Sequence, residues 1–333
     1  MNLIFMGTPD FAVPTLQTLI QNGYDVSLVV TQPDRPKGRG RKVAPPPVKE
    51  RALQLNYPVY QPESIKSDTA YSTLSALRPD IFVVVAFGQM IPKATLLTPK
   101  ICAMNLHASL LPKYRGPAPI QWAIINGEKE TGVTTMLMDE GMDTGDILLA
   151  SKVDITPEDT SATLHDKLAV TGARLILDTI KGFADGSVAA KPQDPLQASH
   201  APLLSKQDGH IDWHRPAEEL ENLIRGVTPW PGAFTFCGEM RLKILKARHV
   251  ASDSDHDPGT VLSSFPGELR IATGKDALLV KEIQGTSGKC LDVAVDHGIF
   301  NEYRSLDGLE SIPKVVAQLV EAGPDAIQMN YGQ

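Results

Sequence analysis

The sequence lacks the features that mark secreted, metal-binding and membrane proteins. Its 333 residues contain only three cysteines, and no two of them form a CxxC pair, which argues against a disulfide framework or a metal site. No fully apolar run is longer than Ile81–Phe87, far below the length of a membrane span. The chain also opens without a basic segment followed by a long apolar one, so we expect no signal peptide and a cytoplasmic location.

An excess of positive charge is missing as well. The formal net charge is −7, so binding of a polyanion would depend on local basic patches rather than on the whole surface. The remaining composition is ordinary for a globular protein, with 42% hydrophobic and 21% charged residues. A length of 333 residues favours two domains. Nothing in the sequence indicates an obligate partner chain, so we expect a monomer.

The first half of the chain alternates short apolar strands with helices. The strands are predicted at residues 2–6, 26–30, 81–86, 102–106 and 134–138, and a turn and a helix connect the first two. Strand–turn–helix–strand units with short connections predict a doubly wound α/β domain with a mostly parallel sheet. Ligands of such sheets bind beyond the carboxyl ends of the strands. We therefore expect the residues that follow the predicted strands to lie close together at this edge of the sheet. They are Gly7, Phe87, His107 and Asp139.

The second half has a different pattern. A long amphipathic helix is predicted over residues 161–184, and a proline-containing stretch without periodicity follows it. Beyond a short helix at 217–225, short alternating runs with glycine turns predict a small β-barrel. The predicted organisation is thus a catalytic domain over residues 1–190, a linker over 191–207 and a C-terminal β-barrel domain over 208–333.

Three polar residues form the densest chemical constellation. Asn105 and His107 are two positions apart at a predicted strand end, so their side chains point to the same side. Asp143 lies in the acidic, glycine-rich loop that follows another strand. An amide, an imidazole and a carboxylate suit acyl transfer without a covalent intermediate, because the amide stabilises an oxyanion while the imidazole handles protons. No serine or cysteine here has the setting of a nucleophile, and Ser109 lacks the glycine-flanked elbow of hydrolases.

Each of the three residues has an ordinary structural explanation when taken alone. A single histidine is most often structural, and an isolated aspartate or asparagine at a strand end is most often a turn or cap residue. Their combination in one spaced cluster favours a catalytic site. The other histidines have no spacing typical of metal ligands. Leu110 and Leu111 are apolar within an expected surface loop, which suggests that they flank a flat ligand.

Long motifs around these residues resemble the 10-formyltetrahydrofolate-dependent formyltransferase family. They are GTPDFAVPTL at 7–16, TQPDRPKGRGRK at 31–42, NLHASLLPKYRG at 105–116, TGVT at 131–134, MDEGMDTGD at 138–146, HIDW at 210–213 and PWPGAF at 229–234. The resemblance covers roughly residues 1–300. It implies a Rossmann-like formyltransferase domain followed by an oligonucleotide-binding-like (OB-like) barrel. The tail from about residue 300 does not match the family's usual ending.

The resemblance also implies roles for individual residues. Asn105, His107 and Asp143 match the catalytic residues of formyl transfer. The segments that match the binding site of the formyl donor, 10-formyltetrahydrofolate, contain Ser109, Leu110, Leu111 and Pro112; Phe87, Gly88, Gln89, Met90 and Ile91; and Asp139, Glu140, Gly141 and Met142. No metal is implied. The implied acceptor is the amino group of the methionyl moiety of initiator methionyl-tRNA, so the implied role lies in translation initiation.

A basic loop over residues 34–42 is the main candidate for contact with tRNA. By itself a run of charges is most often a solvated loop, and this one is too rich in glycine and proline to be a helix. The resemblance implies instead that it contacts the tRNA acceptor stem, where cations neutralise phosphates. Its cations are Arg35, Lys37, Arg39, Arg41 and Lys42. Lys206 and the basic strand at 241–248 are weaker candidates, because the second domain is acidic as a whole.

Three other functions remain open from the sequence. A sibling formyltransferase acting on a small amine, such as a nucleotide sugar or glycinamide ribonucleotide, or a formyltetrahydrofolate hydrolase, would share the same polar trio but would not need the basic loop. A nicotinamide-dependent oxidoreductase is disfavoured, because the first turn carries GTPDFA instead of GxGxxG. A non-catalytic RNA-binding protein would not need an intact Asn105, His107 and Asp143.

Overall fold

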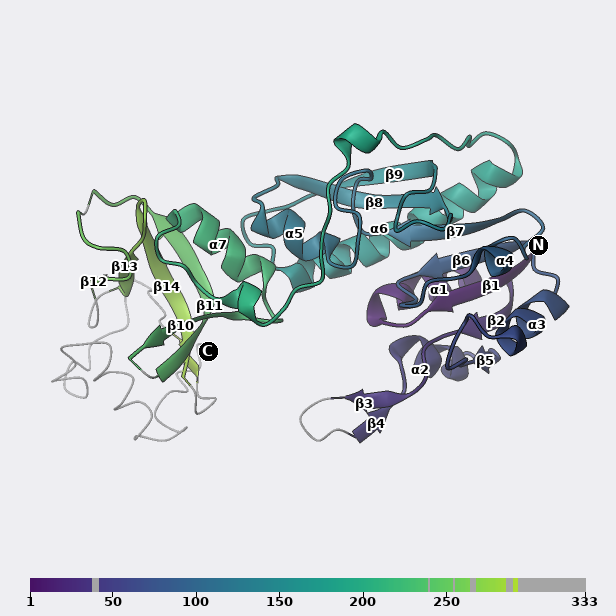
Figure 1. Ribbon diagram of the computed structural model, residues 1–333, viewed down its shortest axis with the longest axis horizontal. Helices are drawn as coiled ribbons and strands as arrows, with labels where there is room; N and C mark the ends of the chain where they lie inside the picture. Colours follow the sequence, from purple (N-terminus) through teal and green to yellow (C-terminus); the bar gives the residue numbers. More distant parts are fainter. Residues whose placement is uncertain (38–41, 239, 254, 264–267, 286–289, 293–333) are drawn as a thin grey trace, which may run out of the picture. The chain divides into compact units, whose positions relative to one another are not determined.

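The computed structural model describes residues 1–37, 42–238, 240–253, 255–263, 268–285 and 290–292 (Figure 1). The chain forms two compact units. Unit 1 comprises Met1–Ile120, Lys129–Pro157 and Thr163–Leu203. Unit 2 comprises Gln121–Glu128, Glu158–Ala162 and Leu204–Gln333. The predicted combination of an α/β domain with a smaller domain of antiparallel strands is confirmed.

A seven-stranded sheet forms the centre of unit 1. In spatial order its strands are β5 (Val59–Tyr60), β2 (Asp25–Val30), β1 (Asn2–Gly7), β6 (Ile81–Val85), β7 (Cys102–His107), β8 (Glu130–Leu137) and β9 (Ile147–Asp154). The first five strands are parallel, whereas β8 runs antiparallel to β7 and β9 antiparallel to β8. The sheet is therefore mostly parallel, as predicted, with an antiparallel edge that the sequence had not indicated.

Both faces of the sheet are covered, which explains the continuous apolar runs of its strands. Ile4, Phe82 and Val84 face a core that includes Leu74 of α3 (Asp68–Ala76) and Leu96 of α4 (Lys93–Leu96). The remaining short helices of this unit are α1 (Val13–Gln21), α2 (Pro47–Gln54) and the first residues of α5 (Pro119–Ile125).

The long helix α6 (Ser161–Ala184) has the bounds that the sequence predicted. It packs against the opposite face of β7 and β8. An added Cβ on Gly172 would lie 2.5 Å from Leu106 of β7. The hydroxyls of Thr179 and Thr135 of β8 are 2.8 Å apart. Because α6 covers the side on which Leu106 lies, alternation along the strand leaves Asn105 and His107 on the other side.

The basic loop begins and ends as a short two-stranded ribbon. β3 (Arg35–Lys37) pairs antiparallel with β4 (Lys42–Ala44), and the residues between the two strands lie outside the described part of the chain. At the base of the ribbon, Asp34 accepts hydrogen bonds from Gln61 at 2.7 Å and Lys49 at 2.7 Å. These two donors hold the pKa of the Asp34 carboxyl below its usual range, so the anchor stays ionised at neutral pH.

In the part of unit 2 that the structure describes, a helix packs on a curled antiparallel sheet. The helix is α7 (Ala217–Gly226). The strands are β10 (Ala233–Cys237), β11 (Met240–Val250), β14 (Ala277–Gln284), β13 (Arg270–Ala272) and β12 (Val261–Ser263), with β15 (Cys290–Asp292) pairing β14. Buried Glu221 of α7 joins the helix to β11, because its carboxylate accepts from Arg248 Nη1 at 2.7 Å and from the His249 backbone at 2.8 Å.

No helix within the described residues has the length and apolarity needed to cross a lipid bilayer.

Candidate active site

Strand β7 places Asn105 and His107 on one side of the sheet. Asn105 pairs with Met136 of β8, and His107, the last residue of the strand, pairs with Thr134. The His107 side chain is 7% exposed, and that of Asn105 is half-buried. Within the part of the chain that the structure describes, no hydrogen bond occupies the Asn105 amide. Its two N–H donors are therefore available for a ligand.

Asp143 reaches this place by a route that the sequence had not indicated. We expected the loop after the 134–138 strand to lie at the same edge as His107. That expectation is wrong for the strand, because β8 is antiparallel and ends beside Met104, toward the beginning of β7. The loop from Met138 to Asp146 instead returns toward the end of β7, and Asp143 Oδ2 lies 3.6 Å from His107 Nδ1.

The two ring nitrogens of His107 have different surroundings. Nε2 lies 2.9 Å from the carbonyl oxygen of Tyr114, which can only accept a hydrogen bond, so Nε2 carries a hydrogen and donates it. Nδ1 faces the Asp143 carboxylate. Such fixing of one ring nitrogen by a backbone carbonyl sets the ring's tautomer and orientation.

Asp143 is held by its own hydrogen bond. Its Oδ2 accepts from the backbone N–H of Gly116 at 2.8 Å, and the side chain is 16% exposed. Segment 114–116 therefore contacts both groups, His107 through the Tyr114 carbonyl and Asp143 through the Gly116 amide. This arrangement brings together an amide, an imidazole with one open nitrogen and an oriented carboxylate, which is the set needed to stabilise an oxyanion and move a proton.

The predicted donor-binding loop of Ser109, Leu110, Leu111 and Pro112 is tied to β8. Buried Thr134 bridges it, because its hydroxyl donates to Ser109 O at 2.7 Å and accepts from Leu111 N at 3.1 Å. The Ser109 hydroxyl donates to Lys113 O at 2.6 Å. Leu111 is buried, and Leu110 lies against Gly132, so both leucines pack on protein. The structure thus gives these residues a packing role in addition to any ligand that they contact.

The segment Phe87 to Ile91 is anchored at its two ends. Phe87 and Ile91 are buried in the sheet core, while Met90 between them is half-exposed. The carbonyl of Phe87 accepts from the Thr8 hydroxyl at 2.8 Å, and Gln89 Oε1 accepts from Ile65 N at 2.7 Å. Anchored ends leave the backbone of Gly88 and the Met90 side chain accessible for a ligand.

The acidic segment Asp139 to Met142 forms a compact turn. The Asp139 carboxylate accepts from Gly141 N at 3.0 Å and from the Thr144 hydroxyl at 2.7 Å. Glu140 forms an exposed ion pair with Lys93 at 2.9 Å. Met142 is 56% exposed, so this turn, like the preceding segment, offers an apolar methionine side chain to the surface.

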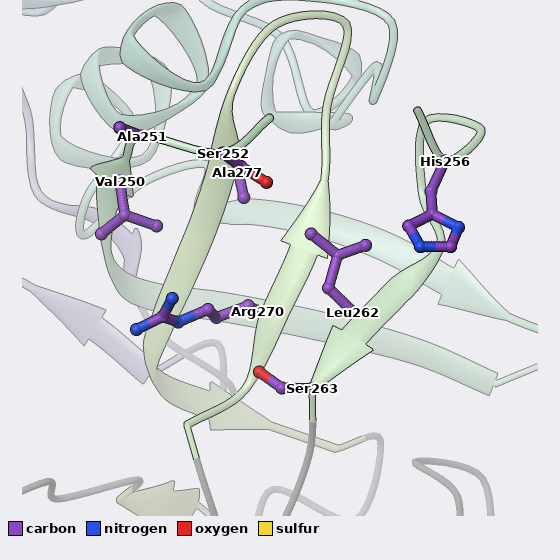
Figure 2. A pocket seen from close by; sticks show the side chains of 8 residues that line it. All are labelled: Val250, Ala251, Ser252, His256, Leu262, Ser263, Arg270 and Ala277. Carbon is purple, nitrogen blue, oxygen red and sulfur yellow. The ribbon is translucent and has the colours of Figure 1, made fainter. Parts of the chain in front are cut away.

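Two cavities lie in different units. One of about 520 Å³ in unit 1 lies at the base of the ribbon, and its lining includes Thr8, Gln32, Arg35, Phe87 and Gly88. The other, of about 270 Å³, lies in unit 2 beside strands β12 to β14 (Figure 2). Arg270 in its wall is already paired with Glu268. The second cavity contains none of the predicted site residues.

The predicted tRNA-contacting residues are described only in part. Arg35 is exposed at the start of β3, and Lys206 is exposed before a turn in unit 2. Lys37 and Lys42 pair through their backbones at the far end of the ribbon. Arg39 and Arg41 lie outside the described residues.

In the basic strand at 241–248, Arg248 pairs with Glu221 and Glu158, and the Arg241 guanidinium lies 3.8 Å from the centre of the Phe234 ring. Both of these arginines thus have partners inside unit 2.

No cluster of three or more His, Cys, Asp or Glu residues suited to a metal ion occurs among the described residues. Cys102, the first residue of β7, is also unsuited to nucleophilic chemistry. Burial raises the pKa of its thiol to about 11, so the thiolate is scarce at neutral pH.

We expect Cys102 in the folded protein to resist alkylation at pH 8. A pKa about two units above the ordinary value lowers the thiolate fraction roughly 100-fold, and burial limits access further. Iodoacetamide labelling followed by peptide mass spectrometry measures this directly, with the urea-unfolded chain as the control. Labelling of the folded and unfolded chains at equal rates would contradict the assigned environment. By the same linkage, the neutral thiol stabilises the fold below its ordinary pKa, and this contribution is lost as pH rises toward 11.

Several residues of the site had no recognised role in the sequence. Gln193 and Ser199 lie in the stretch that was predicted to be a linker. The Ser199 hydroxyl accepts from Tyr114 N at 2.9 Å, and Gln193 contacts Arg115 and the Asp143 loop. The proline content of the stretch indicated irregular structure, but nothing in it pointed to these contacts. Gly116 lay in a recognised motif, although its hydrogen bond to Asp143 was not foreseen.

Comparison with known proteins agrees with this fold. Residues 1–180 match the formyl transferase family model, and residues 203–295 match the model for the formyl transferase C-terminal domain. The chain belongs to the formyl transferase family.

The chain is also similar to individual methionyl-tRNA formyltransferases. It is 50% identical to the methionyl-tRNA formyltransferase of Caldanaerobacter subterraneus subsp. tengcongensis over 85% of this chain and 92% of that protein. It is likewise 50% identical to the methionyl-tRNA formyltransferase of Desulfotalea psychrophila over 88% of this chain and 91% of that protein.

Solved structures share the fold at lower identity. An N-formyltransferase from Helicobacter canadensis, crystallised with folinic acid and dTDP-3-aminofucose, aligns with a TM-score of 0.63 and 20% identity over 84% of this chain and 98% of its own. HypX from Aquifex aeolicus, in complex with tetrahydrofolic acid, aligns with a TM-score of 0.58 and 16% identity over 88% of this chain and 46% of its own.

Proposed function

We propose that this protein transfers the formyl group of 10-formyltetrahydrofolate to the amino group of the methionyl moiety of initiator methionyl-tRNA, in preparation for translation initiation. The observation that carries the proposal is the buried His107 facing Asp143 at 3.6 Å, with the Asn105 amide on the same side of β7. The 50% identity to methionyl-tRNA formyltransferases over most of the chain supports this acceptor over a small amine.

The reaction joins the amine nitrogen to the formyl carbon and breaks the bond between that carbon and N10 of the folate. The amine loses one proton and N10 gains one. Asn105 donates an N–H to the formyl oxygen as it gains negative charge, an interaction that typically contributes roughly 3 kcal/mol. His107 moves protons through Nδ1, and Asp143 stabilises the charged ring and orients it.

The fit of a folate donor rests on two segments of unit 1. Met90 and Met142 are exposed apolar side chains of the kind that pack on flat rings, and the Gly88 backbone beside Met90 is open. A folate supplies the formyl group when bound. The residues of this chain position the group and exclude water from it, since His107 and its neighbours are largely buried.

The acceptor is proposed to approach along the basic ribbon. The cations of 35–42 neutralise phosphates of the acceptor stem, and the nearby cavity of about 520 Å³ adjoins Phe87 and Gly88 of the proposed donor site. We further propose that residues 1–190 supply the catalytic domain and residues 208–333 a second tRNA-contacting domain, with 191–207 between them. Lys206 is a candidate contact in that stretch.

We expect the double variant Arg39→Ala, Arg41→Ala to use methionyl-tRNA roughly tenfold less efficiently at low salt, because two phosphate-neutralising cations are lost. The logarithm of kcat/KM plotted against the logarithm of salt concentration should flatten by about one unit for each arginine that contacts a phosphate. Steady-state kinetics across a salt series measures both effects.

The matched control is Lys66→Ala, which removes an exposed cation outside the ribbon. It should leave the salt dependence unchanged, and binding of the folate donor should be equal in all three proteins. An arginine variant with weakened donor binding would mean that the loop does not act on tRNA.

The proposed function is tested by incubating the purified full chain with 10-formyltetrahydrofolate and methionine-charged initiator tRNA. Formylation of the charged tRNA is expected, with none of free methionine and none of uncharged tRNA. Transfer to a small amine or release of formate without an acceptor would favour the sibling enzymes instead. Binding of tRNA without any turnover would favour a non-catalytic RNA-binding protein.

A further inference from the structure

The side chain of Gln193 uses its entire hydrogen-bonding capacity beside the catalytic groups. Its Nε2 donates to the carbonyl oxygens of Asp143 at 2.9 Å and Gly145 at 2.7 Å. Its Oε1 accepts from Arg115 Nε at 3.0 Å and Nη2 at 2.7 Å. An amide offers two N–H donors and two acceptor lone pairs, and all four are engaged. Gln193 therefore has nothing left to offer a substrate, so any role in the reaction must act through its neighbours.

Those neighbours are the two segments that hold the catalytic side chains. Arg115 lies between Tyr114, whose carbonyl accepts from His107, and Gly116, whose amide donates to Asp143. Arg115 is 9% exposed, and among the described residues its guanidinium hydrogen-bonds to Gln193 alone. The Gln193 amide thus links the segment that fixes His107 to the loop that carries Asp143.

The backbone of Asp143 requires such support. Its φ is +55°, in the left-handed region that is unfavourable for a residue with a Cβ. Such conformations persist where the surroundings impose them. Two bonds from a single amide, to the carbonyls of residues 143 and 145, fix the peptide plane that follows Asp143 and the one that follows Gly145. The direction of the Asp143 carboxylate follows from that backbone.

The chain on either side of Gln193 is itself secured. Lys191 and Ile147 exchange backbone hydrogen bonds at 2.9 and 2.8 Å. Farther along, Arg115 N donates to Ser199 O at 2.8 Å, and Ala201 N donates to Arg115 O at 2.7 Å. Backbone hydrogen bonds therefore hold residues 191–201 at one end to Ile147, just after the Asp143 loop, and at the other end to Arg115. These bonds fix the position of the backbone that carries the Gln193 side chain.

We propose that Gln193 is a positioning residue for formyl transfer: its amide locks the Asp143 loop to Arg115 and so holds the Asp143 carboxylate against His107. The inference rests on the proposed function and adds a residue to it. Misplacement of a reacting group by about 1 Å can cost up to about 100-fold in rate. Because Asp143 retains its bond from Gly116, we expect a loss of about tenfold when Gln193 is removed.

The test compares Gln193→Ala, Gln193→Glu and the control Gln197→Ala in the full-length protein. Gln193→Glu keeps two oxygens for Arg115 but loses both donors to the loop carbonyls. Gln197 lies in the same stretch and makes one side-chain bond, to exposed Asp194. The measurements are kcat and KM for both substrates, the number and affinity of donor sites, and amide hydrogen exchange of peptides covering 114–118 and 139–146.

For Gln193→Ala we expect kcat about tenfold lower, both KM values within about twofold, full donor binding and faster exchange in both peptides. Gln193→Glu should be no better, because the lost donors are what the loop needs. Gln197→Ala should match the wild type.

Wild-type kcat in Gln193→Glu would overturn the proposal, since retaining Arg115 and side-chain volume would then suffice. A kcat within twofold of wild type in Gln193→Ala, or a kcat loss matched by an equal loss of donor sites, would also overturn it. Failure of the proposed function is distinguishable, because the wild type and Gln197→Ala would then both fail to formylate methionyl-tRNA, while the exchange rates would still report on the Gln193 contacts.

Discussion

His107→Ala is expected to lower kcat for formylation of methionyl-tRNA by about 100-fold or more, with little change in tRNA affinity. The substitution removes the ring nitrogen that faces Asp143, and a positioned proton-transfer group typically contributes about 100-fold to 10,000-fold in rate. The imidazole is 7% exposed and makes its hydrogen bond to the Tyr114 carbonyl inside the fold, so it offers little surface to a tRNA. Single-turnover kinetics with saturating donor, beside tRNA binding by filter retention, measures the two effects separately.

The matched control for this variant is His214→Ala. That imidazole is 81% exposed in unit 2 and contacts Asp212, so its removal should leave turnover unchanged. Near-normal turnover in His107→Ala would refute the role assigned to this histidine. Equal losses in turnover and in donor binding would indicate that the ring supports the site only by packing.

Gly116→Ala is expected to destabilise unit 1 by about 2–4 kcal/mol and to lower kcat at least roughly tenfold. The φ of Gly116 is +117°, which side chains disfavour, and an added Cβ would lie 2.8 Å from the carbonyl oxygen of Ala201. Any backbone shift that relieves this contact moves the Gly116 amide, which donates to Asp143. Urea unfolding monitored by fluorescence, together with kcat of the folded fraction, measures both effects.

Gly23→Ala provides the comparison. Gly23 also has a positive φ, of +75°, but nothing lies within 4 Å of its added Cβ. Its cost should be about 1 kcal/mol from the backbone alone, without loss of kcat. If the two alanine variants were equally stable and equally active, the close approach of residues 116 and 201 would have no energetic consequence.

Much of unit 1 could be predicted because its patterns are local. The run Ile81–Val85 is apolar throughout since both faces of β6 are covered, and α6 shows its apolar side over all of Ser161–Ala184. The direction of β8 is not local information. A run such as residues 134–138 has the same character whether its neighbour is parallel or antiparallel, and β9 was missed because its second half alternates half-buried and exposed residues and contains no fully buried one.

Part of the geometry of the candidate site could also be predicted from the sequence. Asn105 and His107 were placed on one side of their strand because alternation requires it, and β7 has that geometry. Asp143 was named correctly as a neighbour of His107, but by an argument about strand ends that the antiparallel β8 invalidates. Gln193 lies 50 residues from Asp143 in the sequence, and no spacing rule connects two such positions.

The bond between His107 and the Tyr114 carbonyl limits how protons can travel. With Nε2 committed to a backbone oxygen, the ring exchanges hydrogen only through Nδ1. In the proposed mechanism, the departing amine proton and the proton that N10 requires would therefore use the same nitrogen one after the other, because turning the ring over between them would break a buried bond. The two proton transfers proposed for His107 are therefore sequential, because a single ring nitrogen serves both.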